Sequence, residues 1–286
     1  MPIDIKPLAA GLYMVSTPIG AARDITLRAL DVLASADVLA AEDTRTLRKL
    51  MEIHGVALRE RPMVPYHDHN GPAARPRILD ALAAGKSVAY ASEAGTPLVA
   101  DPGYQLAGAA IAEGHPVIAA PGASAVLAAL AVGGLPTDRF FFAGFLPNAQ
   151  AARRAELLEL RAVPSTMVFY ESPKRVGEML GDLVTVWGHE RRAAVCRELT
   201  KRFEEVSRGT LGDLAAAFAG RSVKGEIVVL VDRDRSVATQ ESLEDALDRA
   251  LSSMSVKDAA ATVAEALGLP KRQVYQAALA RGAKDG

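Results

Sequence analysis

The chain has 286 residues, of which 50% are hydrophobic and 23% are charged, and its formal net charge is −1. This composition is typical of a globular protein with room for two or three domains and excludes an intrinsically disordered chain. A balanced charge gives no general affinity for polyanions, so a nucleic-acid site would have to be a local patch. The single cysteine, Cys196, excludes an internal disulfide and a cysteine-rich metal site.

No targeting or membrane-spanning segment is expected. The first residues, MPIDIKPLAAGLYMV, lack the basic start and apolar core of a signal peptide. The longest uncharged stretch, residues 116–136, is interrupted at Pro121-Gly122 and closed by Gly133-Gly134. That pattern fits a buried strand, a turn and a helix better than a membrane span. We therefore expect a cytoplasmic protein.

The first half of the chain alternates apolar strand-like runs with helical patterns. The expected strands cover residues 12–17, 38–41, 87–91 and 117–120, and helical patterns begin near residues 24, 45, 104 and 124. Continuous apolar strands between helices predict a parallel sheet covered on both faces. Ligands of such sheets bind at the carboxyl ends of the strands. The segments expected at those ends are Ser16-Thr17-Pro18, Glu42-Asp43, Ser92-Glu93 and Pro121-Gly122.

The second half has fewer helices for each strand, which predicts a mixed α/β domain. Strands are expected at residues 139–145, 166–170, 193–197 and 227–231, and helices at 151–160 and 176–186. Residues 232–241 (DRDRSVATQE) form a polar linker. We therefore predict an α/β chain with three domains, a parallel-sheet domain over 1–136, a second α/β domain over 137–235 and a small helical domain over 241–286.

Two helices are expected in the C-terminal part. Ser255 and Asp258 fit an N-cap box for a helix that runs to Leu267. The turn Gly268-Leu269-Pro270 separates it from a second helix over residues 271–280. Two short helices joined by a glycine-containing turn resemble a helix-turn-helix. A helical tail packed on a neighbouring domain is an equally good interpretation.

Several loops at the expected strand ends could hold a ligand. Ser16–Gly20 has one glycine and a proline, so it does not fit a phosphate-binding loop, and it suits either close contact with a small molecule or a rigid turn. Glu93 would be costly if buried alone but useful opposite hydroxyl groups or a cation, although it could also cap the next turn. Asp101 is expected to accept a hydrogen bond from the following helix. Ser124 is expected to cap its helix, where free amides could also contact a ligand.

Two later segments, YESPKR over residues 170–175 and RELTKR over 197–202, place basic residues just after strands. A solvated charged face and a phosphate-binding patch explain this equally well. Earlier in the chain, His67-Asp68-His69 could present two imidazoles on one face of a strand. A third ligand is not apparent nearby, so we do not expect a metal site.

Taken together, the motifs resemble the tetrapyrrole-methylase superfamily, and within it the enzymes that methylate small-subunit ribosomal RNA. The resemblance covers residues 12–231 in order, and residues 242–286 resemble a small helix-turn-helix domain that is often appended. The motifs that carry it are LYMVSTPIGAARDIT, AAEDTRTLRKLM, SEAGTPLVADPG, PGASAVLAAL, FYESPKR, RELTKRFEEVSRGTL and KGEIVVLV.

The resemblance implies a two-domain α/β enzyme that binds S-adenosylmethionine in the cleft between its domains. It implies methyl transfer to the ribose 2′-hydroxyl of a cytidine in the decoding region of 16S ribosomal RNA, a homodimer and no metal. The implied cofactor contacts are Pro18, Ile19, Glu93, Gly95, Thr96, Ala123, Ser124, Tyr170, Glu171, Leu199 and Gly225.

The chemistry of the acceptor suggests further residues. A ribose hydroxyl is a weak acid, so a base or a nearby cation would assist the transfer. The candidates are Asp43, Glu171, Lys174 and Lys201, and the sequence does not choose among them. Our hypothesis is that Glu171 and Lys201 orient the nucleotide. The expected RNA-binding residues are Arg175, Arg197, Lys201 and Arg202.

The sequence departs from the usual family pattern at four positions, and two of these bear on which residue could act as the base. Ala21 and Glu93 replace a usual Asn and Asp, whereas Lys174 and Phe203 replace common histidines. The histidine losses argue against a histidine base at either position. Two other functions stay open, methylation of a corrin or porphyrin ring and DNA binding through residues 255–282. The STPIG loop argues against the first, and the small positive charge of the tail argues against the second.

Overall fold

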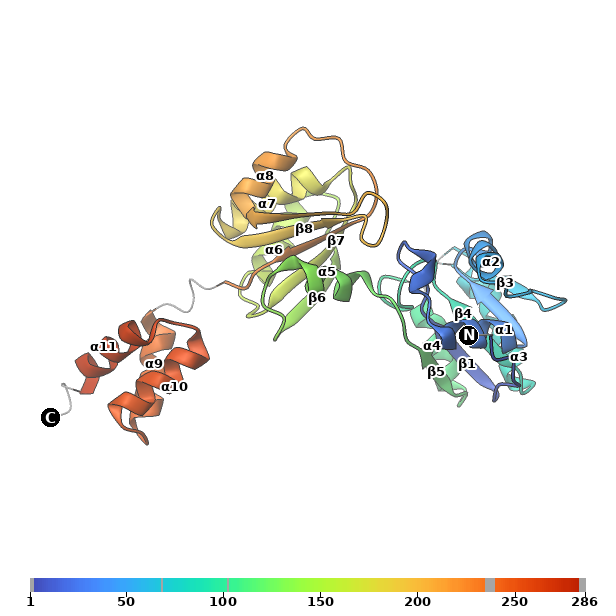
Figure 1. Cartoon of the computed structure of the whole chain (residues 1–286), viewed down its shortest axis with the longest axis horizontal. Helices are drawn as coiled ribbons and strands as arrows, with labels where there is room; N and C mark the ends of the chain where they lie inside the picture. The colour runs from blue at the N-terminus through green and yellow to red at the C-terminus, as the bar shows by residue number, and fades with distance from the viewer. Residues whose placement is uncertain (1–2, 68, 102, 235–239, 283–286) are drawn as a thin grey trace.

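The structure is a computed structural model that describes residues 3–67, 69–101, 103–234 and 240–282. Two units, each built on a five-stranded sheet, are followed in the chain by a unit of helices (Figure 1). Within the described ranges, no helix is both long and apolar enough to cross a lipid bilayer.

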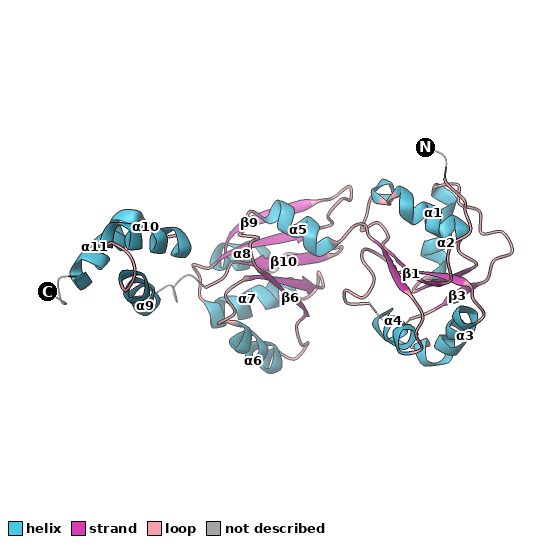
Figure 2. Cartoon of the chain, turned by 90° about the horizontal axis from the view of Figure 1, so that it is seen from below, coloured by secondary structure: helices cyan, strands magenta, loops and turns pink. Residues whose placement is uncertain are grey.

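The first sheet is parallel throughout, as predicted, and has the strand order β3-β2-β4-β1-β5. Its strands are β1 (Gly11–Val15), β2 (Val38–Ala41), β3 (Met63–Pro65), β4 (Ser87–Ala91) and β5 (Val117–Ala120). Helices cover both faces of the sheet (Figure 2). α1 (Leu27–Ser35) and α2 (Thr44–Ile53) pack on one face, and α3 (Gly71–Ala83) and α4 (Gly103–Ala112) pack on the other.

The second sheet is mixed, as predicted, with the order β6-β7-β10-β8-β9. Only the β6–β7 pair is parallel among these neighbours. The strands are β6 (Phe140–Phe145), β7 (Thr166–Glu171), β8 (Arg192–Arg197), β9 (Glu205–Thr210) and β10 (Ile227–Val231). One face packs against α6 (Gln150–Leu160), α7 (Val176–Trp187) and α8 (Leu211–Phe218).

The other face of the second sheet is covered by α5 (Ala125–Gly133), which precedes the expected domain boundary at residue 136. The core there joins Val126 and Leu130 of α5 to Val228 and Leu230 of β10. The short link between β5 and α5 therefore connects the two units. Ser124 stands at the N-cap position of α5, but its hydroxyl makes no capping hydrogen bond within the described part of the chain, so the expected side-chain cap is wrong.

The C-terminal unit has three helices, α9 (Gln240–Leu251), α10 (Val256–Leu267) and α11 (Lys271–Gly282), around an apolar core of its own. The Ser255 hydroxyl accepts a hydrogen bond from the Asp258 amide at 3.2 Å, which confirms the predicted N-cap. Gly268 ends α10 in the left-handed region, with a φ of 63°. Residues 235–239 of the predicted linker lie outside the described ranges.

Candidate functional site

A cleft of about 470 Å³ lies between the two sheet-containing units. This volume is within the range of about 300–1,000 Å³ that is typical of small-molecule sites. The first unit contributes residues that follow β1, β2 and β4, at the carboxyl edge of its parallel sheet, and the junction between the units contributes Ser124 and Ala125 at the start of α5. The second unit contributes the segment after β7, the loop after β8 and the start of β10.

Two loops of the first unit are joined backbone to backbone at the cleft. The Thr17 amide donates to the Gly95 carbonyl at 2.9 Å, and the Gly95 amide donates to the Thr17 carbonyl at 3.1 Å. Gly95 has a φ of 83°, and a β-carbon there would lie 3.2 Å from the Ile19 side chain. The left-handed backbone therefore favours glycine at this position, and a β-carbon would also require Ile19 to shift by a few tenths of an ångström.

Two carboxylates of the first unit line the cleft, Glu93 and Glu42. Glu93 is exposed, so the burial penalty considered from the sequence does not arise. Glu42 is half-buried, and its Oε2 accepts a hydrogen bond from the Glu93 amide at 3.2 Å. Burial, together with the negative charges of Asp101 and Glu93, raises the pKa of the Glu42 carboxyl above its ordinary value. The Glu42 carboxyl is therefore more readily protonated than an ordinary glutamate.

The residues next to this pair have structural partners. Asp101 accepts from the Gly103 amide at 2.7 Å, which confirms the predicted acceptor, and also from the Tyr90 hydroxyl at 2.9 Å. Asp43 follows Glu42 directly but caps α2, where its carboxylate accepts from the Arg45 amide at 2.7 Å. The cleft is lined by Glu42 and not by Asp43.

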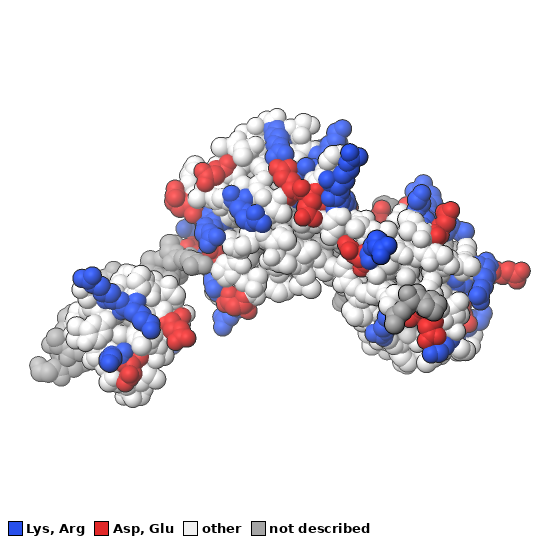
Figure 3. Space-filling model, viewed as in Figure 1, with Lys and Arg blue, Asp and Glu red and all other residues white. Residues whose placement is uncertain are grey.

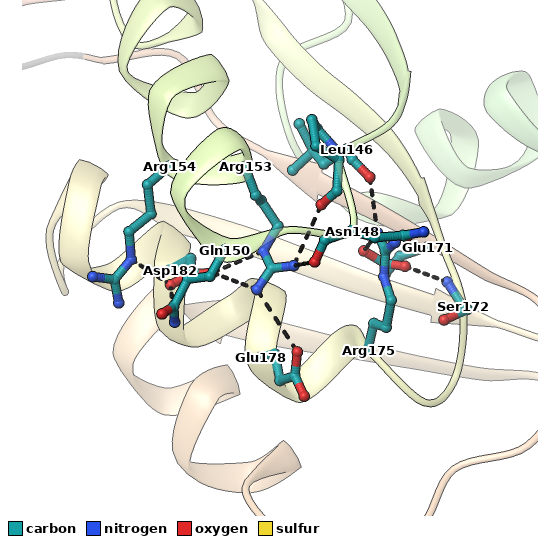
Figure 4. A network of polar contacts seen from close by, with 11 residues as sticks. Leu146, Asn148, Gln150, Arg153, Arg154, Glu171, Ser172, Arg175, Glu178 and Asp182 are labelled. Carbon is teal, nitrogen blue, oxygen red and sulfur yellow. Dashed lines mark hydrogen bonds and ion pairs between the residues drawn. The ribbon is translucent and has the colours of Figure 1, made fainter.

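In the second unit, Glu171 at the end of β7 is buried in a network of polar contacts (Figure 4). Its carboxylate pairs with the Arg175 guanidinium at 2.7 Å and accepts from the Ser172 amide at 2.6 Å. Arg175 also donates to the Leu146 carbonyl at 2.9 Å. These contacts fix the segment after β7 as one side of the cleft.

The loop after β8 forms another part of this wall through Leu199. Lys201 pairs with Glu198 at 2.8 Å and with Glu226, which also lines the cleft, at 2.6 Å. Burial lowers the pKa of Lys201, but its hydrogen bonds to these two carboxylates raise it by more, so the ammonium stays charged. Gly225 has a φ of 95°, and a β-carbon there would overlap the Glu198 side chain.

The same loop contacts the first unit. The Ala21 amide donates to the Thr200 hydroxyl at 3.1 Å. A β-carbon on Gly20 would lie 2.5 Å from the Lys201 side chain and 2.6 Å from the Thr200 hydroxyl. The single glycine of the STPIG segment therefore permits the two units to meet at the rim of the cleft.

The basic residues predicted to bind RNA differ in their surroundings. Arg197 pairs with Glu205 at 3.1 Å, and Arg175 and Lys201 are paired as described above. Arg202 and Lys174 are exposed and have no carboxylate partner within the described residues. Figure 3 shows basic and acidic side chains interleaved on the surface of the second unit that is in view. The patch that can meet an anion is therefore smaller than the count of basic residues implies.

Most of the predicted cofactor positions line the cleft. Those that do are Ile19, Glu93, Gly95, Thr96, Ser124, Tyr170, Glu171, Leu199 and Gly225. Pro18 and Ala123 lie beside it; the Ala123 carbonyl accepts from the Thr96 hydroxyl at 2.9 Å. Of the four catalytic candidates, Glu171 is a lining residue, whereas Asp43, Lys174 and Lys201 are not among the residues that line it.

Sequence reasoning missed several lining residues, including Glu42, Val99, Phe145, Cys196 and Val228. Glu42 carried a usable signal, because it begins an acid pair directly after a strand. Phe145, Cys196 and Val228 carried none, since a strand residue reaches the cleft only where the packing of helices leaves that part of the sheet open, whereas Val99 lies in the loop between β4 and α4. Burial raises the pKa of the Cys196 thiol to about 11.

Metal-binding side chains do not gather in the described ranges, where no group of three or more His, Cys, Asp or Glu residues is arranged to hold an ion. The rings of His67 and His69 have centroids 6.1 Å apart. Asp68, the middle residue of that motif, lies outside the described residues.

Two family models match this chain. The family described as Tetrapyrrole (Corrin/Porphyrin) Methylases matches residues 11–215, and the RsmI C-terminal HTH domain matches residues 237–282. The ribosomal RNA small subunit methyltransferase I of Mesorhizobium japonicum is 47% identical, over 96% of this chain and 93% of its own length. The protein of the same name from Pseudomonas aeruginosa is 42% identical, over 96% of this chain and 99% of its own length.

Solved structures share the fold at lower identity. The methyltransferase CobJ has a TM-score of 0.60 at 22% identity and covers 79% of this chain and 95% of its own. The uroporphyrin-III C-methyl transferase of Thermus thermophilus, complexed with S-adenyl homocysteine, has a TM-score of 0.54 at 20% identity, over 77% of this chain and 96% of its own. By its family match and by its identity to full-length relatives, the chain belongs to the tetrapyrrole methylase family, alongside proteins named ribosomal RNA small subunit methyltransferase I.

Proposed function

We propose that this chain is an S-adenosylmethionine-dependent methyltransferase that modifies the 2′-hydroxyl of a cytidine ribose in 16S ribosomal RNA. The observation that carries the proposal is the 47% identity, over nearly the whole chain, to a relative named ribosomal RNA small subunit methyltransferase I. The 2′-hydroxyl and the cytidine come from the resemblance of the motifs. On the same grounds we propose a cytoplasmic homodimer.

The residues of the cleft fit S-adenosylmethionine in size and chemistry. Ile19, Val99 and Leu199 provide apolar walls suited to a purine ring. The exposed carboxylate of Glu93 suits ribose hydroxyls or a positive charge. When bound, this cofactor supplies a methyl group that is already activated by a sulfonium. The protein then has to position the ribose hydroxyl in line with that methyl and accept its proton.

Glu42 is our candidate for accepting the proton. Its carboxylate lines the cleft, and the Glu93 amide holds one of its oxygens at 3.2 Å. A general base is most effective when its pKa lies closer to the working pH, and the pKa of Glu42 is shifted in that direction. Asp43 would have to give up its hydrogen bonds at the start of α2 to do the same work.

Glu171 and Lys201 suit a positioning role, because each is held by an ion pair within the second unit. Replacing both with alanine should abolish transfer and leave cofactor binding measurable. Arg202 and Lys174 are the candidates for phosphate contacts, since both are exposed. Arg175 and Arg197 are paired with Glu171 and Glu205, so they would stabilise the RNA-binding surface without contacting phosphate themselves.

The reaction itself is tested with radiolabelled S-adenosylmethionine, the purified chain and small ribosomal subunits that lack the modification. A precorrin mixture is offered in parallel. Label in 2′-O-methylcytidine of the subunit RNA would support the proposal. Label in the tetrapyrrole, with the subunit RNA unlabelled, would overturn it and favour the other branch of the family.

The role of Glu42 is tested by Glu42→Gln, with Asp43→Asn as its comparison. We expect Glu42→Gln to lower kcat by about 10²–10⁴-fold with little change in the KM for S-adenosylmethionine. A base must be ionised, so wild-type kcat should fall as the pH drops through the raised pKa of Glu42, and that acid limb should vanish in the variant. If kcat fell only in Asp43→Asn, Asp43 and not Glu42 would be the residue that accepts the proton.

A further inference from the structure

The loop over residues 198–204 is closed by its own hydrogen bonds. Glu198 and Thr200 both adopt positive φ values, 50° and 62°, which non-glycine residues rarely do. Two turns close within the loop, from the Lys201 amide to the Glu198 carbonyl at 3.0 Å and from the Glu204 amide to the Lys201 carbonyl at 3.1 Å. The Glu204 carboxylate turns back and accepts from the Thr200 amide at 2.6 Å. The chain therefore holds this loop in one conformation despite local strain.

The first half of the loop is anchored at the cleft. Leu199 is buried and lines the cleft, and Lys201 is paired with Glu226 on the same wall. Thr200 accepts a hydrogen bond from Ala21 of the first unit. The next residues of the loop consequently present their side chains close to the cleft.

The residues presented there are Arg202 and Phe203. The Phe203 side chain is 63% exposed, and the Arg202 guanidinium lies 5.5 Å from the centre of its ring. With the Glu204 carboxylate turned back into the loop, the outward surface combines an aromatic face with a positive charge. An aromatic ring beside an arginine is the combination that proteins use to stack an unpaired base and neutralise its phosphate.

We propose that Phe203, assisted by Arg202, is a stacking platform for an unpaired base of the RNA substrate. The inference rests on the proposed function and deepens it by adding a binding position outside the cofactor cleft. An RNA site is favoured over contact with a second copy of the chain, because the exposed ring of Phe203 lies beside the charged and exposed Arg202. Protein interfaces are built around a wider apolar centre than one ring.

The test compares Phe203→Ala, Phe203→Leu and Phe203→Trp in the full chain, with unmodified small subunits as substrate. Removing one base-stacking ring should raise the KM for the subunit by about tenfold to a hundredfold. The KM for S-adenosylmethionine and the melting temperature should stay unchanged. Tryptophan should keep the wild-type KM, whereas leucine, which is apolar but cannot stack, should behave like alanine.

Leu158→Ala is the matched control, because Leu158 lies on α6 and is 62% exposed. We expect no change in the KM for the subunit. The inference is overturned if leucine restores the wild-type KM, if alanine leaves it unchanged, or if the alanine variant fails to form the wild-type oligomer, which would assign Phe203 to a contact between copies. Wild-type protein that labels no RNA would refute the proposed function instead.

Discussion

Replacing Asp182 with asparagine removes one charge from a buried ion pair without creating a cavity. Asp182 and Arg153 are each only 1% exposed, and their charged groups lie 2.7 Å apart. Asp182 also accepts from Arg154 at 2.6 Å and from Gln150 at 3.2 Å (Figure 4). Burial raises the pKa of Asp182, but the two arginines lower it by more, so the carboxylate is ionised at neutral pH.

The size of the effect follows from what remains around Arg153. Its other acceptors are the carbonyls of Asn148 and Pro147 and the distant carboxylate of Glu178, at 3.7 Å. A buried charge that loses its partner destabilises a protein by about 3–5 kcal/mol. For a protein of this size, each kcal/mol lowers the melting temperature by about 2–4 °C, so we expect a decrease of roughly 6–20 °C.

Urea unfolding and calorimetry of Asp182→Asn measure this loss, and Glu178→Gln is the control. Glu178 pairs with the same guanidinium but is 69% exposed, so its loss should cost less than about 1 kcal/mol. The double variant Arg153→Met with Asp182→Leu removes both charges and should recover most of the stability. Equal losses in Asp182→Asn and Glu178→Gln would refute the assignment of a buried charge pair.

Two further predictions concern the second unit. Gly225→Ala should raise the KM for S-adenosylmethionine at least tenfold, because the new β-carbon would displace Glu198. Gly220 also has a positive φ, 68°, but open space around it, so Gly220→Ala should lower the free energy of unfolding by only about 1 kcal/mol. Glu205→Gln should lower the melting temperature at pH 7, because the hydrogen bond from Arg221 depresses the pKa of Glu205 to about 2. That stabilisation is present above the ordinary pKa of 4.5 and disappears as the pH falls toward 2, so a difference from wild type that is constant with pH would contradict it.

The strands that the sequence predicted most accurately are those formed by a continuous run of buried apolar residues. β2, β4, β5 and β10 were located to the residue, because each is a short continuous apolar run. α3 was missed because its Pro72 and Pro76 are signals against a helix, although a proline in the first turn costs no hydrogen bond. β9 was missed because EVSRGT is only partly buried, and its strand state depends on pairing with β8.

The site was predictable to the level of loops but not of individual side chains. The ends of β1, β2 and β4 were expected to meet at one edge, and they do so. Which of the acids Glu42 and Asp43 faces the cleft depends on the start of α2, and the sequence pattern alone does not fix this. The pairing of Lys201 with Glu226 joins residues 25 positions apart, and no local pattern could indicate it.

The two walls of the cleft are held by different interactions, and this explains why so few basic residues remain for RNA. Backbone hydrogen bonds between Thr17 and Gly95 hold the first wall and need no charged groups. The second wall depends on ion pairs, among them Glu171 with Arg175 and Lys201 with Glu198. Cations used in this way contribute little to phosphate binding, so the substrate must be selected largely by shape and by contacts with its bases. The exposed ring of Phe203, on the loop that Leu199 anchors to the cleft, supplies a contact of that kind.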